Sequence, residues 1–396
     1  MAFEPSAGFA GAISLPRSPL SIPSSPASIP RSPLSTDGNP TLLPEHIVDL
    51  LGLGEFGVGG ELFAAFLGAF LIGNLMLAMT ALAGPWAKRK ITAAFTDRIA
   101  VNQHGPGGIG IIVADAIRLL SKELIVPEKV DRPAYDLAPI VIASSALLGF
   151  AVIPMGSGIH LADPEVGLAF VFATASIASV GLVMAGYASA NKYSMLGGLR
   201  AVAQNIAYEI PLIVTGMSVV IFAGSLRMSE IVAIQTETIL FTIPGIGVGV
   251  PAWFALVNPF AFVLFMIANF AEIGRNPFDT PEAPTEIVAG YQTEYSSVYF
   301  VLIYLGEFIH IFLGGAIIAT IFLGGPAGPV LPGIVWFLIK IWGVFLLTQW
   351  LRSALPRVRI DQLIEIGWKG LLILSFVNLA LTAIIVAVLH SAGVMA

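Results

Sequence analysis

Residues 271–308 read AEIGRNPFDTPEAPTEIVAGYQTEYSSVYFVLIYLGEF and join an acid-rich segment to an apolar one that continues to residue 324. A membrane-spanning helix needs about 20 mostly apolar residues, so we expect 298–324 to cross a bilayer. Only 11% of the 396 residues are charged. Carboxylates at or near membrane depth are costly and are therefore functional candidates. They suggest a route for protons, and they are Glu272, Asp279, Glu282, Glu286, Glu294 and Glu307.

The composition is that of a polytopic membrane protein. Hydrophobic residues make up 56% of the chain, and we predict an all-α fold with about eight transmembrane helices. Pro211 and Pro259 interrupt the fourth and fifth candidates, but proline is tolerated in a packed spanning helix. No segment shows the alternation with a period of two that a transmembrane β-barrel requires. The candidate spans are 62–84, 137–156, 166–188, 206–224, 251–271, 298–324, 331–351 and 370–391.

The sequence lacks the residues of several redox and catalytic sites. It has no cysteine, which excludes disulfides, thiolate metal sites and cysteine-ligated iron–sulfur clusters in this chain. Its five histidines are scattered, and they predict neither a metal site nor a haem pair. No nucleophile elbow, P-loop, Rossmann fingerprint or zinc motif is evident. The net charge of −6 gives no sign of nucleic-acid binding. Any electron carriers therefore belong to other subunits or arrive as a diffusing ligand.

The basic residues are concentrated in alternate loops. The loops between the remaining spans hold only Arg227, with Arg17 and Arg31 in the N-terminal tail. The positive-inside rule then places the long basic loops on the cytoplasmic side of the cell membrane and both termini outside. Four loops on one side of the membrane hold 15 of the 19 lysines and arginines, namely 85–136, 189–205, 272–297 and 352–369.

The first 40 residues differ from the rest of the chain. They are rich in serine and proline and contain PRSPLS twice, at 16–21 and 30–35. Such a segment does not bury enough apolar surface to fold, so we expect 1–40 to be a disordered tail. Two interpretations stay open, a dispensable extension and translated sequence upstream of the true start. Residues 41–396 are expected to form the membrane domain.

Residues 109–124, IGIIVADAIRLLSKEL, predict an amphipathic helix that lies in the membrane interface. Asp115, Arg118 and Lys122 fall on one helical face, and apolar side chains lie on the other. An ordinary surface helix is the alternative. The position between two spans and on the basic side favours the membrane surface.

The acid-rich segment contains groups suited to changing protonation. Glu272 and Arg275 are three residues apart, which permits contact on a helix. Pairing favours an ionised carboxylate and unpaired burial favours a neutral one. Glu282 and Glu286 would share a helical face, with Glu294 close to it, if a helix begins at the nearby prolines. Such a cluster would titrate as a set.

Three further ionisable residues lie inside or at the start of predicted spans. Glu209 opens the fourth span, Glu307 lies in the sixth and Lys340 lies in the seventh. A buried Glu–Lys pair can simply hold two helices together, so a structural role is the alternative for each. The neighbouring acids favour a functional role for Glu209 and Glu307, and both roles stay open for Lys340.

Several ordered motifs run through the chain. AEIGRNPFDTPEAPTEIVAGYQTEY at 271–295, RAVAQNIAYE at 200–209 and GEF at 306–308 are the most specific. They resemble AExNRxPFDLPExExELVxGYxTEY, RAxAQxISYE and AEY of the H subunit (subunit 1) of respiratory complex I. ADAIRLLSKE at 114–123, and the turn GP before it, resemble a loop of the same family. The resemblance covers about 60–396, and the expected spans and termini agree with it.

The resemblance implies a membrane subunit of a proton-pumping NADH (or other donor):quinone oxidoreductase, with no redox centre in this chain. Such a subunit forms much of a quinone-binding chamber and the start of a proton-coupling channel. Carried over position by position, the coupling residues are Glu209, Glu272, Glu282, Glu286, Glu294 and Glu307. The quinone-chamber residues are Asp115, Arg275, Phe278 and Asp279.

The resemblance also implies partners. Quinone would be a substrate that enters from lipid, whereas iron–sulfur clusters and flavin would belong to hydrophilic-arm subunits. One of these subunits would carry the terminal cluster beside the quinone site. Small membrane subunits and antiporter-like subunits would be neighbours in the membrane, and no nucleic acid is expected.

The sequence departs from the family pattern at three positions. Pro284 stands where the family has an acid, so the loop has one carboxylate fewer. Gln103 stands where an arginine usually precedes the GP turn, and Gly274 replaces the asparagine of AExNR.

Other functions remain as alternatives. A membrane subunit of an energy-converting hydrogenase or other-donor dehydrogenase would be similar, but the carboxylate-rich loop and the TEY element favour a quinone-type complex. A stand-alone secondary transporter would fit the intramembrane charges, but we find no duplication of the spans, as a transporter built from inverted repeats would have. The least specific alternative is an assembly scaffold whose acids only hold helices together.

Overall fold

The computed structural model describes residues 42–53, 57–156, 158–237, 239–242, 249–328 and 331–391, with only the backbone given at 81–82, 239–242 and 249–251. The expected disordered tail, 1–40, lies outside these residues. All described residues belong to one compact unit, Asn39–Ala396.

The described chain is mostly helical, which confirms the predicted fold class. The strands among the described residues are one short antiparallel pair, β1 (Ile239–Thr242) and β2 (Gly249–Pro251), which the sequence did not predict. The helices are α1 (Leu43–Leu51), α2 (Val58–Ala78), α3 (Gly84–Phe95), α4 (Gly110–Leu120), α5 (Arg132–Gly149), α6 (Gly167–Ala188), α7 (Lys192–Ala223), α8 (Met228–Glu237), α9 (Phe254–Val257), α10 (Pro259–Glu272), α11 (Ser297–Phe322), α12 (Gly333–Ala354), α13 (Ile360–Glu365) and α14 (Leu372–Ser391). π-helical turns, Met79–Ala83 and Ile366–Leu371, join α2 to α3 and α13 to α14.

Seven helical segments among the described residues are long and apolar enough to cross a membrane. They correspond to seven of the eight expected spans. The fifth expected span, 251–271, is represented by α10, which has only 14 residues. At 1.5 Å per residue α10 is about 21 Å long, less than a hydrocarbon core of about 30 Å. It begins late because Pro259 starts the helix, with the Asn258 side chain accepting a hydrogen bond from the Ala261 N–H.

Helix α7 continues through Pro211 and is 32 residues long. A proline inside a helix leaves the carbonyl four residues earlier, here that of Ala207, without its helical donor. The C-terminal helix packs tightly at this level. A Cβ on Gly367 would lie 3.0 Å from the Ala207 oxygen, and the Tyr208 hydroxyl donates to the Leu363 carbonyl at 2.8 Å. Close packing therefore supports α7 where its own backbone bonding is interrupted.

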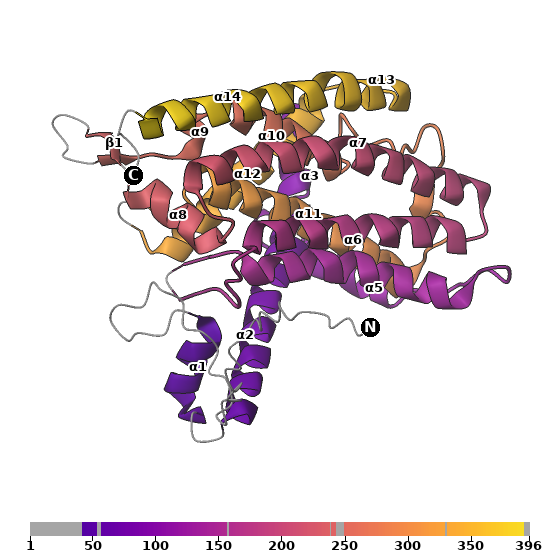
Figure 1. Ribbon diagram of the computed structural model, residues 1–396. Helices are drawn as coiled ribbons and strands as arrows, with labels where there is room; N and C mark the ends of the chain where they lie inside the picture. Colours follow the sequence, from indigo (N-terminus) through magenta and orange to yellow (C-terminus); the bar gives the residue numbers. More distant parts are fainter. Residues whose placement is uncertain are drawn as a thin grey trace, which may run out of the picture. The chain divides into compact units, whose positions relative to one another are not determined.

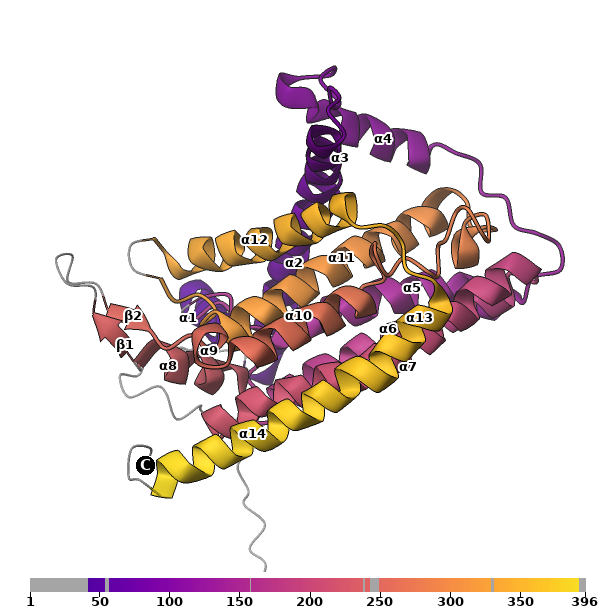
Figure 2. The same cartoon turned by 90° about the horizontal axis from the view of Figure 1, so that it is seen from above.

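The long helices lie side by side, as Figures 1 and 2 show. Helix α5 packs on α6 and α11, and α7 packs on α6, α10 and α14. The loops expected to share one side of the membrane do meet at one end of these helices, which we call the basic-loop end. There the Val358 N–H donates to the Pro277 carbonyl, and the Asp131 N–H donates to the Ala188 carbonyl. Which side of the membrane this end faces stays a prediction.

The expected amphipathic helix is α4, although it is shorter than predicted. Its Val113, Ile117 and Leu120 side chains are each more than half exposed. Its contact with a membrane surface stays a prediction.

Candidate functional site

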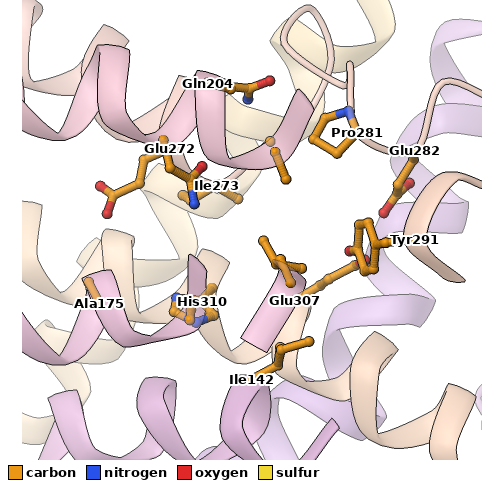
Figure 3. Close-up of a pocket in the computed structure, with 15 residues that line it drawn as sticks. Ile142, Ala175, Gln204, Glu272, Ile273, Pro281, Glu282, Tyr291, Glu307 and His310 are labelled. Carbon is orange, nitrogen blue, oxygen red and sulfur yellow. The ribbon is translucent and has the colours of Figure 1, made fainter. Parts of the chain in front are cut away.

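A cavity of about 70 Å³ lies among α5, α6, α7, α11 and the end of α10. Glu272, Glu282, Glu307 and His310 contribute to its wall, and Figure 3 shows Glu272 on one side of the view and Glu282 on the other, with Glu307 and His310 between them. Buried water needs roughly 10–15 Å³ of such space per molecule, so several waters fit. The cavity can therefore connect these carboxylates through water.

Glu307 has a dense set of hydrogen-bond donors. Its Oε2 lies 2.9 Å from Nη2 of Arg275, and the Tyr291 hydroxyl donates to its Oε1 at 2.6 Å. The Gln292 side-chain amide donates to the same oxygen. Glu307 is ten residues beyond the start of α11 at Ser297, about 15 Å along the helix. Arg275, Tyr291 and Gln292 belong to the loop between α10 and α11, residues 273–296, which we call the polar loop. The polar loop thus reaches into the helix bundle to stabilise this carboxylate.

The carboxyl groups of Glu282 and Glu307 are close enough to interact directly. Two carboxyl groups can hydrogen bond to each other only when one of them carries a proton, so a proton bound by this pair can shift between them. Burial alone would raise the pKa of Glu282. Arg275, the hydrogen bond with Glu307, and the cations Lys88 and Arg352 together hold that pKa below its ordinary value.

Two glycines allow the loop to place Tyr291 beside Glu307. Gly290 has φ +58°, and a Cβ there would lie 1.8 Å from the Pro281 carbonyl oxygen. On α7, a Cβ at Gly197 would lie 2.6 Å from the Tyr291 backbone nitrogen. Both contacts are closer than real Cβ atoms approach, so a side chain at either position would displace the loop.

The expected helix through the acid-rich segment is wrong. Between α10 and α11 the chain forms turns, with one 3₁₀ turn at Gly290–Gln292, because several prolines prevent a continuous helix. Glu282, Glu286 and Glu294 therefore do not share a helical face. Glu286 is half-exposed and lies 2.5 Å from Arg200, and Glu294 accepts a hydrogen bond from the Asn191 amide. Neither lines the cavity.

The expected contact between Glu272 and Arg275 is also not formed among the described residues. Helix α10 ends at Glu272, and Gly274 then turns the chain with φ +68°. Arg275 consequently leaves the helical path and pairs with Glu307. The turn requires a positive φ that glycine adopts without strain.

Glu209 lies next to the cavity. It is one helical turn beyond Asn205 of the cavity wall, and the Ser176 hydroxyl donates to its Oε1. Its charge is close enough to Glu272 for the two carboxylates to interact. The four carboxylates Glu209, Glu272, Glu282 and Glu307 thus form one group, which we call the carboxylate cluster.

The residues that the resemblance assigns to a quinone chamber lie outside this cavity, apart from the connection of Arg275 to Glu307. Asp115 of α4 pairs with Arg89 at 2.7 Å and with Arg118 at 2.5 Å. The Phe278 ring lies 5.7 Å from the Tyr208 ring.

Asp279 is buried and pairs with Arg357 at 3.1 Å. Its Oδ1 atom has no hydrogen-bond partner among the described residues. Burial, reinforced by the charge of Glu282, raises the pKa of Asp279 to about 6 despite the opposing effect of Arg357.

Several polar residues of the site were not identified from the sequence. Tyr291 and Gln292 stand within GYQTEY, beside acids that were identified. Gln204 donates to the Ala271 carbonyl at 2.5 Å and accepts from the Thr280 hydroxyl at 2.6 Å. His310 has its Nε2 3.5 Å from the Ser145 hydroxyl, and its spacing of three from Glu307 was the available signal. Within the described ranges, no group of three or more His, Asp or Glu residues is arranged to hold a metal ion.

Comparisons with known proteins identify similar chains. A family model described as NADH dehydrogenase matches residues 68–383. The H subunit of NADH-quinone oxidoreductase from Dehalococcoides mccartyi (strain CBDB1) is 42% identical over 298 residues, which are 75% of this chain and 80% of the relative. The same protein of Geobacillus kaustophilus (strain HTA426) is 41% identical over 338 residues, 84% of this chain and 94% of the relative. That of Bacillus cereus (strain B4264) is 42% identical over 309 residues, 76% and 88% respectively. The family match includes every helix that lines the cavity.

Proposed function

Because this chain belongs to the NADH dehydrogenase family and is a membrane subunit of an NADH-quinone oxidoreductase, we propose that its carboxylate cluster couples quinone reduction to proton movement. One observation carries the proposal. A cavity large enough for several waters has three carboxylates in its wall, two of which are close enough to interact directly. Groups of this kind can pass a proton without a large rearrangement of the helices.

The polar loop is the element that senses quinone chemistry. Reduction of a quinone to a quinol consumes two electrons and two protons, so it changes the charge next to the chamber. Glu282 lies in the loop, outside the membrane spans, and its shared proton extends to Glu307 inside α11. A change of charge near Glu282 shifts this proton, because the two carboxyl groups titrate as a pair. Water in the cavity then links Glu307 to Glu272, with Glu209 beyond it.

The quinone chamber lies at the basic-loop end in this proposal. Asp115, Phe278 and Asp279 are at this end and outside the cavity. Arg275 accepts a backbone hydrogen bond from Phe278 and pairs with Glu307 of the carboxylate cluster. A hydrophilic-arm subunit completes the chamber and delivers electrons from its terminal iron–sulfur cluster, since this chain has no cysteine to ligate one. The basic-loop end therefore faces the cytoplasm, and antiporter-like subunits receive the coupled charge change in the membrane.

The test replaces Glu272 with Gln, which keeps the size of the side chain and removes its ability to ionise. Quinone reduction and proton pumping are measured in native membranes, and assembly is checked on a native gel. We expect an assembled complex whose pumping falls at least tenfold. The control is Glu365→Gln, because Glu365 forms an exposed ion pair with Lys369 at 2.9 Å and such pairs contribute little.

Each outcome decides between two roles for Glu272. An assembled Glu272→Gln complex with normal pumping would exclude Glu272 from proton coupling. Loss of the assembled complex, with the control intact, would support the scaffold interpretation instead.

A further inference from the structure

Lys88 lies beside the carboxylate cluster but comes from a helix outside the cavity wall. It belongs to α3, beyond the apolar span Val58–Ala78. Its Nζ is 5.5 Å from the centroid of the Tyr304 ring and 5.3 Å from that of Phe308. Phe308 follows Glu307 directly in α11. The Lys88 amine therefore packs against the turn of α11 that carries the central carboxylate.

The cations around this turn are not equally neutralised. Arg275 lies over the same Phe308 ring at 5.4 Å and pairs with Glu307 at 2.9 Å. Lys88 makes no hydrogen bond or ion pair with any residue that the structure describes, and neither does Arg352. The aromatic rings attract the ammonium group, but they cannot accept its proton.

The charged groups that face Lys88 come from three elements. Arg275 and Glu282 belong to the loop, Glu307 belongs to α11, and Arg352 lies near the end of α12. Burial and the charges of Arg275 and Arg352 lower the pKa of Lys88 to about 7, although Glu307 and Glu282 oppose the change. Both the ammonium and the amine are then populated at neutral pH.

We propose that Lys88, held against the turn of α11 that carries Glu307, exchanges a proton with water and thereby controls how tightly Glu282 and Glu307 hold a proton between them. This inference rests on the proposed coupling function and extends it from carboxyl groups to an amine. In the ammonium state, Lys88 favours carboxylates nearby, so the shared proton leaves more easily. When Nζ releases its proton and becomes an amine, that attraction disappears and the carboxyl pair retains its proton. Lys88 acts through the two carboxyl groups and is a positioning residue.

The experiment fixes Lys88 in each state. Lys88→Arg is always charged, and Lys88→Met is always neutral and of similar length. Proton pumping is measured in native membranes on both sides of pH 7, with assembly checked on a native gel. The control is Lys90→Met on the same helix, whose Nζ forms only an exposed contact of 3.5 Å with Asn102.

The expected result is a crossover. The amine-to-ammonium ratio changes tenfold per pH unit, so wild type should follow Lys88→Arg below the pKa and Lys88→Met above it. Pumping by Lys88→Arg should differ from wild type at least threefold above the pKa, and pumping by Lys88→Met should differ at least threefold below it. The change in pumping near pH 7 should be missing from the pH profiles of both variants. The Lys90→Met profile should match wild type. Persistence of that change near pH 7 in both variants, or identity of Lys88→Arg with wild type at every pH, would overturn the inference.

A second measurement covers variants that fail to assemble. Reductive methylation of Lys88 in the wild-type complex, followed by mass spectrometry, requires the neutral amine. Its rate should reach half of its maximum near pH 7, whereas an ordinary lysine approaches this point near pH 10.4. A midpoint near 10 would reject the inference. If the Lys88 profile is unchanged while Glu272→Gln abolishes pumping, only the role of Lys88 fails. Normal pumping in Glu272→Gln would remove the coupling function itself.

Discussion

The two ends of α11 stabilise buried charges in different ways. Glu307, near the basic-loop end, contacts other groups that can ionise, namely Arg275, Tyr291 and Glu282. Lys340 of α12, near the other end, donates only to backbone carbonyls and lies 5.1 Å from the Trp253 ring centroid. The accepting carbonyls are those of Leu323, Gly325 and Ala327, at 2.7, 2.7 and 2.8 Å. Backbone carbonyls do not titrate at physiological pH, so the lysine is the one titratable group among these contacts, whereas Glu307 has a second carboxyl group, that of Glu282, beside it.

The end of α11 that lies away from the basic-loop end is also fixed by a second side chain. Gln235 of α8 donates to the Thr320 carbonyl at 3.0 Å and accepts from the Gly324 N–H at 3.0 Å. The last carbonyls of a helix lack helical donors and carry a partial negative charge. Gln235 satisfies one such carbonyl, and Lys340 satisfies that of the C-cap Leu323 and two in the segment that follows, which favours the structural role for Lys340. One fixed end, together with ionisable groups near the basic-loop end, suits a helix that changes charge without moving as a whole.

The largest effect is expected when Lys340 is replaced with Met, which tests whether Lys340 is structural and differs in this from Glu307. Three carbonyls would lose their partner, at about 1–3 kcal/mol for each one that is buried, and these hydrogen bonds are buried at Gly325 and partly buried at Leu323 and Ala327. We expect a loss of several kcal/mol and hence little assembled complex on a native gel, with normal pumping by whatever assembles. Lys192→Met, at an exposed position in the first turn of α7, should leave the yield unchanged. Normal assembly together with lost pumping would instead make Lys340 a coupling residue and remove the contrast.

The contrast also shows which parts of the fold a sequence can predict. Long apolar runs predicted eight spans, and seven of them are confirmed, because burial in lipid constrains every residue of a span. The same approach predicted a fifth span that is longer than α10, because the apolar residues N-terminal to Pro259 form the separate short helix α9 and do not extend α10. It missed β1 and β2, whose short pairing leaves no distinctive pattern.

The sequence indicated which residue types form the site but not which way their side chains point. Acids in an apolar chain identified Glu282, Glu286 and Glu307 as candidates. Whether each faces the cavity depends on turns at Gly274 and Gly290, and a pattern search assuming a helix assigned those directions incorrectly. Lys340 was open for a related reason, because backbone carbonyls occur at every residue and so leave no signature in the sequence.

A smaller effect is expected from a substitution beside Glu307, which tests the role of its hydrogen-bond partners. Tyr291→Phe removes the hydroxyl that donates to Glu307 at 2.6 Å and keeps the ring. A hydrogen bond to a charged group contributes about 1.5–3 kcal/mol, so we expect pumping to fall about tenfold with assembly retained.

Tyr295→Phe is the matched control for that variant. It lies in the same loop, and its hydroxyl donates to the Tyr135 carbonyl at 3.2 Å, a backbone acceptor. Pumping by the assembled Tyr295→Phe complex should be normal. Equal losses in the two variants would mean that the loop needs hydroxyl groups for its fold and that the partners of Glu307 have no special role.

The smallest expected effect concerns Asp279, which resembles Glu307 in pairing with an arginine but lies outside the cavity. Because burial raises its pKa from 3.8 to about 6, the folded state binds a proton more tightly than the unfolded state. This group therefore favours folding more as the pH falls through 6, the reverse of the usual aspartate, and between pH 7 and 5 the gain is about 1 kcal/mol. Asp279→Asn removes the titration. The thermal midpoint of the mutant complex should fall relative to wild type between pH 7 and 5, whereas exposed Asp97→Asn should show no such difference. A relative change of opposite sign would mean that Arg357 outweighs burial, so that Asp279 is a charged group with a structural role and not a titratable one like those around Glu307.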